Sequence, residues 1–113
     1  MKIEVRFRGL DASDSLREHA MRQVHSHLSR FGQDLAGVMV RIADLNGPKG
    51  GIDKRCQITV RGPRVGESSL EELSDDGYAA VSAAVERMAR AVGRGLERAR
   101  DERRGDGLAA RRN

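Results

Sequence analysis

Apolar and polar residues alternate along three stretches of the chain, and this alternation predicts three β-strands. Ile3, Val5 and Phe7 alternate with charged residues. The same period of two recurs at 38–42 and at 56–60. Successive side chains of a strand point to opposite faces, so this period indicates one buried face and one face in water.

Residues 67–73 carry a weaker signal. Glu71, Glu72 and Leu73 would suit a helix, whereas their position after the third strand favours a fourth strand at the edge of the sheet. Because an edge strand completes the expected fold, we interpret 67–73 as a strand.

Two other stretches repeat their apolar residues at helical spacing. The first predicts a helix over about 14–31. Ser13 is the expected N-cap, with a competing capping box from Ser15 to Glu18, and Gly32 is the expected residue beyond the end.

A second helix is predicted over about 76–103. It begins at the acidic residues Asp75 and Asp76, and negative charge at a helix N-terminus is stabilised by the helix dipole. The polar residues 105–113 are predicted to form a disordered tail.

These elements follow the order β-α-β-β-β-α and predict an α+β fold. Two helices packed on one face of a four-stranded, mostly antiparallel sheet bury the apolar side of every element. One domain over residues 1–104 is expected, because 113 residues is the length of one domain. The stretch Asn46–Gly51 is interpreted as a mobile hairpin loop, since it lacks the G-K-[ST] ending of a phosphate-binding loop.

The chain is moderately basic. It has 21 Lys and Arg against 17 Asp and Glu, a formal net charge of +4, which favours polyanionic partners. Cys56 is the only cysteine, so an intrachain disulfide is excluded and a reducing compartment is favoured. No apolar stretch resembles a signal peptide or a transmembrane helix, so a cytoplasmic location is expected.

A row of arginines runs along the second predicted helix. Its members are Arg87, Arg90, Arg94 and Arg98. At about 100° per residue they fall within an arc of about 80°, away from the apolar stripe that begins at Val81. Guanidinium groups bind phosphates, so the row could contact successive phosphates of an RNA backbone. The alternative is a solvated helix face on which Glu86, Glu97 and Asp101 pair with these arginines.

Five further basic residues join the candidate nucleic-acid-binding set. Arg6 and Arg8 share the solvent-facing side of the first strand. Arg17 and Arg22 lie on the first helix, and Lys49 lies in the predicted loop. They act as ordinary surface charges unless the fold gathers them near the arginine row.

The sequence predicts neither a catalytic site nor a metal site. His19, His25 and His27 do not share one helix face, which disfavours zinc. The acidic residues around Asp75 suit a helix start better than a pair of catalytic carboxylates, and no nucleophile has a recognisable base. We therefore expect no enzyme, no metal, no cofactor and no small-molecule substrate.

Two segments resemble the ribosome hibernation-promoting factor family, which includes the ribosome-associated inhibitor and was once named for sigma-factor modulation. Residues Asp14–His19, before a helix that ends in Arg30-Phe31, resemble the first helix of that family. Residues Asp76–Val81 resemble the D-x-Y-x-A-I start of its second helix. The arginine row matches positions where the family carries Lys or Arg, and the resemblance spans about 1–104.

The resemblance implies a double-stranded-RNA-binding-like fold and a short-form, monomeric, ribosome-associated factor. It would bind ribosomal RNA of the small subunit in the mRNA/tRNA channel and would have neither a DNA nor a membrane partner. It would inhibit translation or preserve idle ribosomes under stress. The alternative is a protein-interaction module or stress regulator with the same fold and no ribosome binding.

Overall fold

The computed structural model describes residues 1–10, 12–45 and 53–112, with side chains as far as residue 102. The elements in chain order are β1 (Lys2–Arg8), α1 (Asp14–Leu28), the short 3-10 helix η1 (Ser29–Phe31), β2 (Gly37–Asp44), β3 (Lys54–Gly62), β4 (Gly66–Ser74) and α2 (Gly77–Arg112). The edge strand predicted at 67–73 is confirmed as β4.

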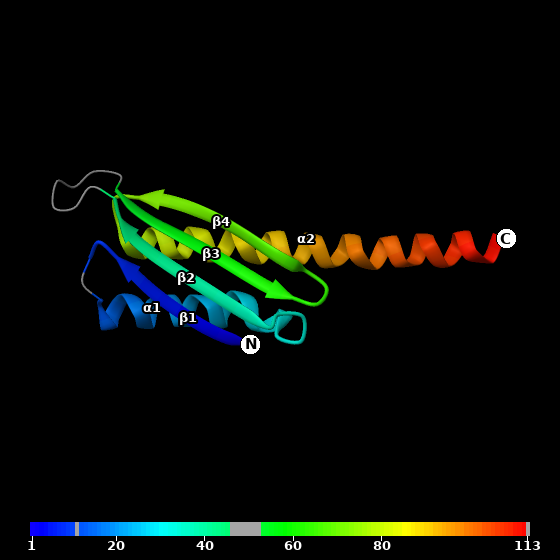
Figure 1. Ribbon diagram of the computed structural model, residues 1–113, viewed down its shortest axis with the longest axis horizontal. Helices are drawn as coiled ribbons and strands as arrows, with labels where there is room; N and C mark the ends of the chain where they lie inside the picture. The colour runs from blue at the N-terminus through cyan, green and yellow to red at the C-terminus, as the bar shows by residue number, and fades with distance from the viewer. Residues whose placement is uncertain (11, 46–52, 113) are drawn as a thin grey trace.

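The strands of the described residues form one sheet in the order β1-β2-β3-β4. β1 and β2 are parallel and are joined through α1, whereas β2, β3 and β4 are successively antiparallel. Both helices lie against the same face of the sheet (Figure 1). The predicted α+β fold with a mostly antiparallel sheet is thus confirmed.

The hydrophobic core lies between the sheet and the two helices. Ile42 and Ile58 from the sheet, and Leu28 and Met88 from the helices, are fully buried there. Alternate strand residues point away from this core, as the period of two requires. No helix within the described part of the chain covers that second face, here called the open face (Figure 1).

The start of α1 agrees with the prediction, but its end does not. The Ser13 hydroxyl accepts a hydrogen bond from the Leu16 amide at 3.2 Å, which confirms Ser13 as the N-cap. The α-helix ends at Leu28 and continues as η1. Gly32 caps η1 with a φ of −56°, so the helical segment stops at the predicted residue, but its last three residues are a 3-10 helix and not part of the α-helix.

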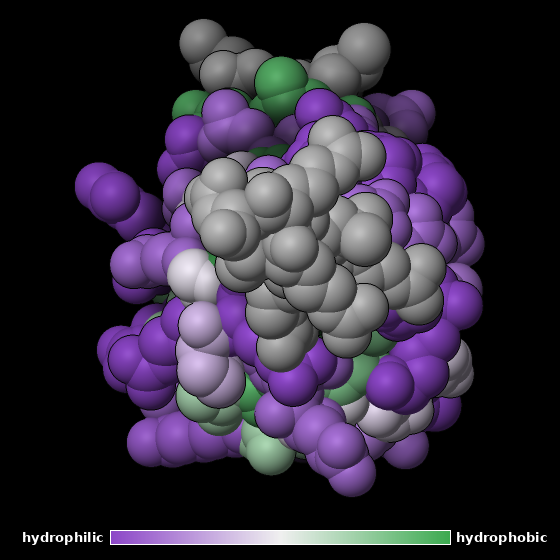
Figure 2. Space-filling model, turned by 90° about the vertical axis from the view of Figure 1, so that its right-hand side faces the viewer, coloured by the Kyte–Doolittle hydropathy of each residue, from purple (hydrophilic) through white to green (hydrophobic). Residues whose placement is uncertain are grey.

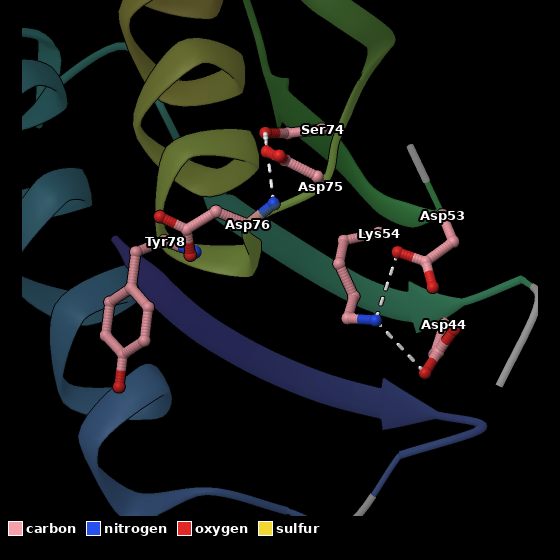
Figure 3. Close-up of polar contacts among 7 residues, drawn as sticks. All are labelled: Asp44, Asp53, Lys54, Ser74, Asp75, Asp76 and Tyr78. Atoms are coloured by element: carbon pink, nitrogen blue, oxygen red, sulfur yellow. Dashed lines mark hydrogen bonds and ion pairs between the residues drawn. The ribbon is translucent and has the colours of Figure 1, made fainter. Parts of the chain in front are cut away.

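The motif at the start of α2 serves the fold directly. The Asp76 carboxylate accepts a hydrogen bond from the Tyr78 amide at 3.0 Å, and Ser74 Oγ accepts one from the Asp76 amide at 3.2 Å (Figure 3). A Cβ on Gly77 would lie 3.3 Å from the Leu16 side chain of α1. Asp76 therefore caps the helix, and Gly77 lets the two helices approach each other.

α2 is longer than predicted. It continues to Arg112, past the expected end near 103, so residues 105–112 are helical where a disordered tail was predicted. Gly105 and Gly107 each weaken a helix by about 1 kcal/mol, but unlike proline they keep the hydrogen-bonding amide. The C-terminal half of α2 extends beyond the end of the sheet (Figure 1). A single domain over 1–104 stays a prediction.

An ion-pair cluster closes the β2–β3 hairpin. The Lys54 ammonium lies 3.2 Å from an Asp44 carboxylate oxygen and 3.1 Å from an Asp53 oxygen (Figure 3). Asp53 is completely buried. The hydrogen bond with Asp53, more than the one with Asp44, raises the pKa of Lys54. The predicted mobile loop Asn46–Gly51 lies outside the described residues.

Candidate nucleic-acid interface

The apolar stripe of α2 determines which arginines face water. Val81, Val85, Met88 and Val92 are all buried against the sheet and α1. Because a helix turns about 100° per residue, residues on its opposite side point outward. This side holds three exposed arginines, here called the α2 row: Arg90, Arg94 and Arg98.

The α2 row is not neutralised by its acidic neighbours. Within the described part of the chain, ion pairs connect none of its guanidinium groups to Glu86, Glu97 or Asp101. The solvated face with internal pairs, which the sequence left open, is therefore not what the structure contains. Three adjacent cations with free donors are available to an external anion.

Arg87 belongs to a different environment from the rest of the predicted row. Its Nη1 lies 2.9 Å from a Glu72 carboxylate oxygen on β4 and donates to the Glu71 carbonyl at 3.5 Å. The side chain therefore links α2 to the edge of the sheet. Its charge is already compensated, so it is a poorer phosphate ligand than the α2 row.

Arg17 has a structural role at the other edge of the sheet. It donates to the Val5 carbonyl of β1 at 2.9 Å, and its guanidinium carbon lies 5.2 Å from the centre of the Phe7 ring. Arg22, one turn further along α1, pairs with Glu18 at 3.2 Å. Both predicted site residues on α1 therefore already have partners within the protein, a backbone carbonyl and a ring for Arg17 and a carboxylate for Arg22.

Replacing Arg17 by alanine should lower the free energy of unfolding by about 1 kcal/mol, because the hydrogen bond to Val5 and the cation–π contact with Phe7 are both lost. Arg22→Ala is the matched control, since its exposed pair with Glu18 contributes only about 0.3–0.5 kcal/mol. Urea unfolding followed by circular dichroism measures both. Equal destabilisation by the two changes would contradict the role of Arg17.

The structure separates the predicted basic residues onto two sides of the molecule. Arg6 and Arg8 lie on the open face, whereas the α2 row lies on the helical layer. Lys49 falls outside the described residues. The predicted set therefore does not form one continuous surface.

Four more basic residues share the open face and were not among the predicted site residues. The register places them beside Arg6 and Arg8, and the combined set, here called the basic strip, is Lys2, Arg6, Arg8, Arg41, Arg55 and Arg61. The alternating pattern of β2 and β3 already placed Arg41, Arg55 and Arg61 on the solvent-facing side. Only the pairing of the strands shows that Arg41 lies directly beside Arg6, and that Arg55 and Arg61 lie on the same face one strand further away.

The contact between α1 and α2 is polar near Tyr78. His19 Nε2 lies 2.9 Å from Ser82 Oγ and 3.2 Å from the Tyr78 carbonyl oxygen. The His19 and Tyr78 rings meet edge to face, with their centres 5.2 Å apart.

Hydrophilic residues dominate the surface seen from the C-terminal end of α2 (Figure 2). This hydrophilic surface suits a charged partner better than an apolar one.

The remaining reactive side chains of the described residues are either buried, as Cys56 is, or too far apart to hold a metal ion together. Burial raises the pKa of the Cys56 thiol to about 12, so it is protonated at neutral pH and is a poor nucleophile. Within residues 1–10, 12–45 and 53–112, no three His, Cys, Asp or Glu side chains are placed to hold a metal ion. Over the same residues, no helix has the length and apolar character to span a membrane.

Comparisons with known proteins match the chain to one protein family and to solved structures of the same fold. A family model described as sigma 54 modulation protein / S30EA ribosomal protein matches residues 3–100. The crystal structure of the Protein Y N-terminal domain from Thermus thermophilus matches with a TM-score of 0.66 and 25% identity, covering 83% of this chain and 98% of that one.

A second solved structure supports the same fold. It is a ribosomal subunit interface protein from Coxiella burnetii, with a TM-score of 0.69 and 18% identity, covering 83% of this chain and 96% of that one. A search of curated protein sequences finds no match.

Proposed function

Because the chain belongs to the sigma 54 modulation protein / S30EA ribosomal protein family, we propose that it is a non-catalytic, ribosome-associated factor. It binds ribosomal RNA of the small subunit in the channel used by mRNA and tRNA. By occupying that channel it inhibits translation or preserves idle ribosomes under stress.

The observation that carries this proposal is the α2 row. Its exposed guanidinium groups lie along one side of a rigid helix, and the described residues provide them with no ion-pair partners. Arg90, Arg94 and Arg98 are four residues apart, so helical rise places successive members about 6 Å apart along the axis. A phosphate backbone offers anions at regular intervals, so a rigid cationic row suits it.

The resemblance to the hibernation family and the similarity to a ribosomal subunit interface protein support a ribosomal target. The chain would act as a monomer through its charged surface. No feature of the described residues favours the alternative of a protein-interaction module without a ribosomal role.

Sedimentation with small ribosomal subunits tests the proposal. Three phosphate contacts give a slope of about −2.1 to −2.7 in log affinity against log salt, so affinity should fall about 20- to 40-fold between 50 and 200 mM salt. The measurement is the fraction of protein that sediments with the subunits in a sucrose gradient at each salt concentration.

Protein that remains at the top of the gradient at 50 mM salt would contradict ribosome association. Protein that sediments equally at both salt concentrations would contradict phosphate binding by the α2 row. Bovine serum albumin in the same gradient controls for trapping by the subunits.

A further inference from the structure

The open face holds a basic strip that the α2 row does not explain. It consists of the six residues defined above, and the carboxylates of the same face are Glu4, Glu67 and Glu71. Glu67 and Glu71 lie on β4, at one edge of the sheet. The positive charge is therefore concentrated over β1, β2 and β3, with acidic side chains along its β4 side.

The basic strip follows the pleat of the sheet in regular rows. Lys2 and Arg61 flank Gly37 in one row, and Arg8 and Arg55 flank Ala43 in the row at the far end. Rows on one face are about 7 Å apart, so three of the four rows over a length of about 20 Å contain cations. This spacing is similar to that of successive phosphates in an extended nucleic-acid strand.

Small residues make the strip a groove. Arg6, Arg8, Arg41 and Arg55 surround a hollow of about 450 Å³ whose lining includes Ala43 and Gln57. A neighbouring hollow of about 340 Å³ is lined by Lys2, Arg61 and others, and it shares Arg41 and Gln57 with the first. The two hollows therefore adjoin at Arg41 and Gln57, and Glu4 and Glu67 also line the second one.

The protein itself compensates only part of this charge. Glu4 pairs with Lys2 and with Arg6, each at 3.3 Å, and these hydrogen bonds lower the pKa of Glu4. Arg55 lies 3.7 Å from Glu71. Among the described residues, Arg8 and Arg41 have no ion pair. Their charge is thus available to an external anion.

We propose that the open face binds the phosphate backbone of a second, extended RNA segment through Arg8, Arg41 and the rest of the basic strip. The length of the strip favours an extended polyanion over a compact one. Among the described strand residues, the register places no aromatic side chain on the open face, because Phe7 belongs to the core-facing set of β1. Binding is therefore largely independent of base sequence. The choice of RNA as the polyanion rests on the proposed function.

Because the sheet lies between the open face and the α2 row, the protein bridges two RNA segments. Such a bridge resists release better than one contact, since the second contact forms at a high effective concentration. The protein would then hold together two parts of its ribosomal site.

The test uses full-length protein carrying Arg90→Glu and Arg94→Glu, so that the α2 row cannot dominate. Fluorescence anisotropy measures binding of a labelled ten-nucleotide oligouridine at 50 mM salt. Binding should persist in this background, and adding Arg8→Gln and Arg41→Gln should weaken it at least tenfold. Adding Arg30→Gln and Arg64→Gln, which lie outside the basic strip and outside the predicted binding set, should change it less than twofold. Arg64 already faces Asp34, and Arg30 lies over the Phe31 ring.

The proposal would be overturned by no oligouridine binding by the α2-row variant, by no effect of the Arg8 and Arg41 changes, or by an equal effect of the control pair. Free uridine monophosphate at the same phosphate concentration should not displace the oligonucleotide. Equal displacement would assign the groove to a free nucleotide and not to RNA. Sedimentation with ribosomes reports on the proposed function, so either proposal can fail without the other.

Discussion

Replacing Arg90 and Arg94 together by glutamate should lower the affinity for small ribosomal subunits by about a hundredfold or more. Each charged hydrogen bond to a phosphate contributes about 1.5 kcal/mol or more, and the introduced carboxylates also repel the RNA. The measurement is sedimentation with the subunits over a range of protein concentrations at 50 mM salt. The salt dependence of the remaining binding should be shallower, because two phosphate contacts are lost.

A control variant with the same net charge distinguishes direct contact by the α2 row from long-range attraction between the protein and the RNA. Each Arg→Glu change lowers the net charge by two, so Arg22→Glu with Arg64→Glu takes the formal charge from +4 to 0, as Arg90→Glu with Arg94→Glu does. Arg22 and Arg64 already face Glu18 and Asp34. If the control pair lost as much affinity, long-range charge and not the α2 row would carry the binding.

The same double variant should keep its folded structure, because Arg90 and Arg94 are exposed on α2. Circular dichroism and a urea midpoint close to that of the parent protein would show this. Retained ribosome binding by a folded Arg90→Glu, Arg94→Glu protein would contradict the role proposed for the α2 row.

Gly62→Ala should be the most destabilising small substitution among the described glycines. A Cβ at Gly62, the last residue of β3, would overlap the backbone carbonyl oxygen of Asp34 and would lie 3.2 Å from the Leu35 Cα. Backbone atoms cannot turn aside as a flexible side chain can, so β3 or the segment before β2 must shift. We expect a loss of about 3 kcal/mol in the free energy of unfolding, measured by urea denaturation.

Gly95→Ala is a control that should change the free energy of unfolding in the opposite direction. A Cβ at Gly95 meets no atom within 4 Å among the described residues, and the backbone there is helical. Alanine is favoured over glycine in a helix by about 1 kcal/mol, so this change should stabilise the protein. A similar loss of stability in both variants would contradict the close backbone contact at Gly62.

The fold could be predicted from the sequence because its signals are local. Alternation at β1, β2 and β3 identifies a half-buried strand without reference to any partner. Ser13 and Asp76 identify helix starts because a cap satisfies backbone amides only two or three residues away. The end of α2 was not predicted, since glycine and polar composition disfavour a helix without preventing one.

The candidate site was predicted only in part, because the partners of a charge are rarely near it in sequence. Helical spacing placed Arg90, Arg94 and Arg98 on one side of α2. It could not show that Arg87 contacts Glu72 on β4, or that Arg17 contacts Val5 on β1.

The sequence by itself determined the strands, the helices and the face of α2 that carries arginines, because these depend on periodicity and on nearest neighbours along the chain. The tertiary structure alone decided which cations remain free, since pairing depends on residues that meet only when the sheet and helices pack. The basic strip is the clearest case: its members come from three strands, and only strand register places Arg8, Arg41 and Arg55 together.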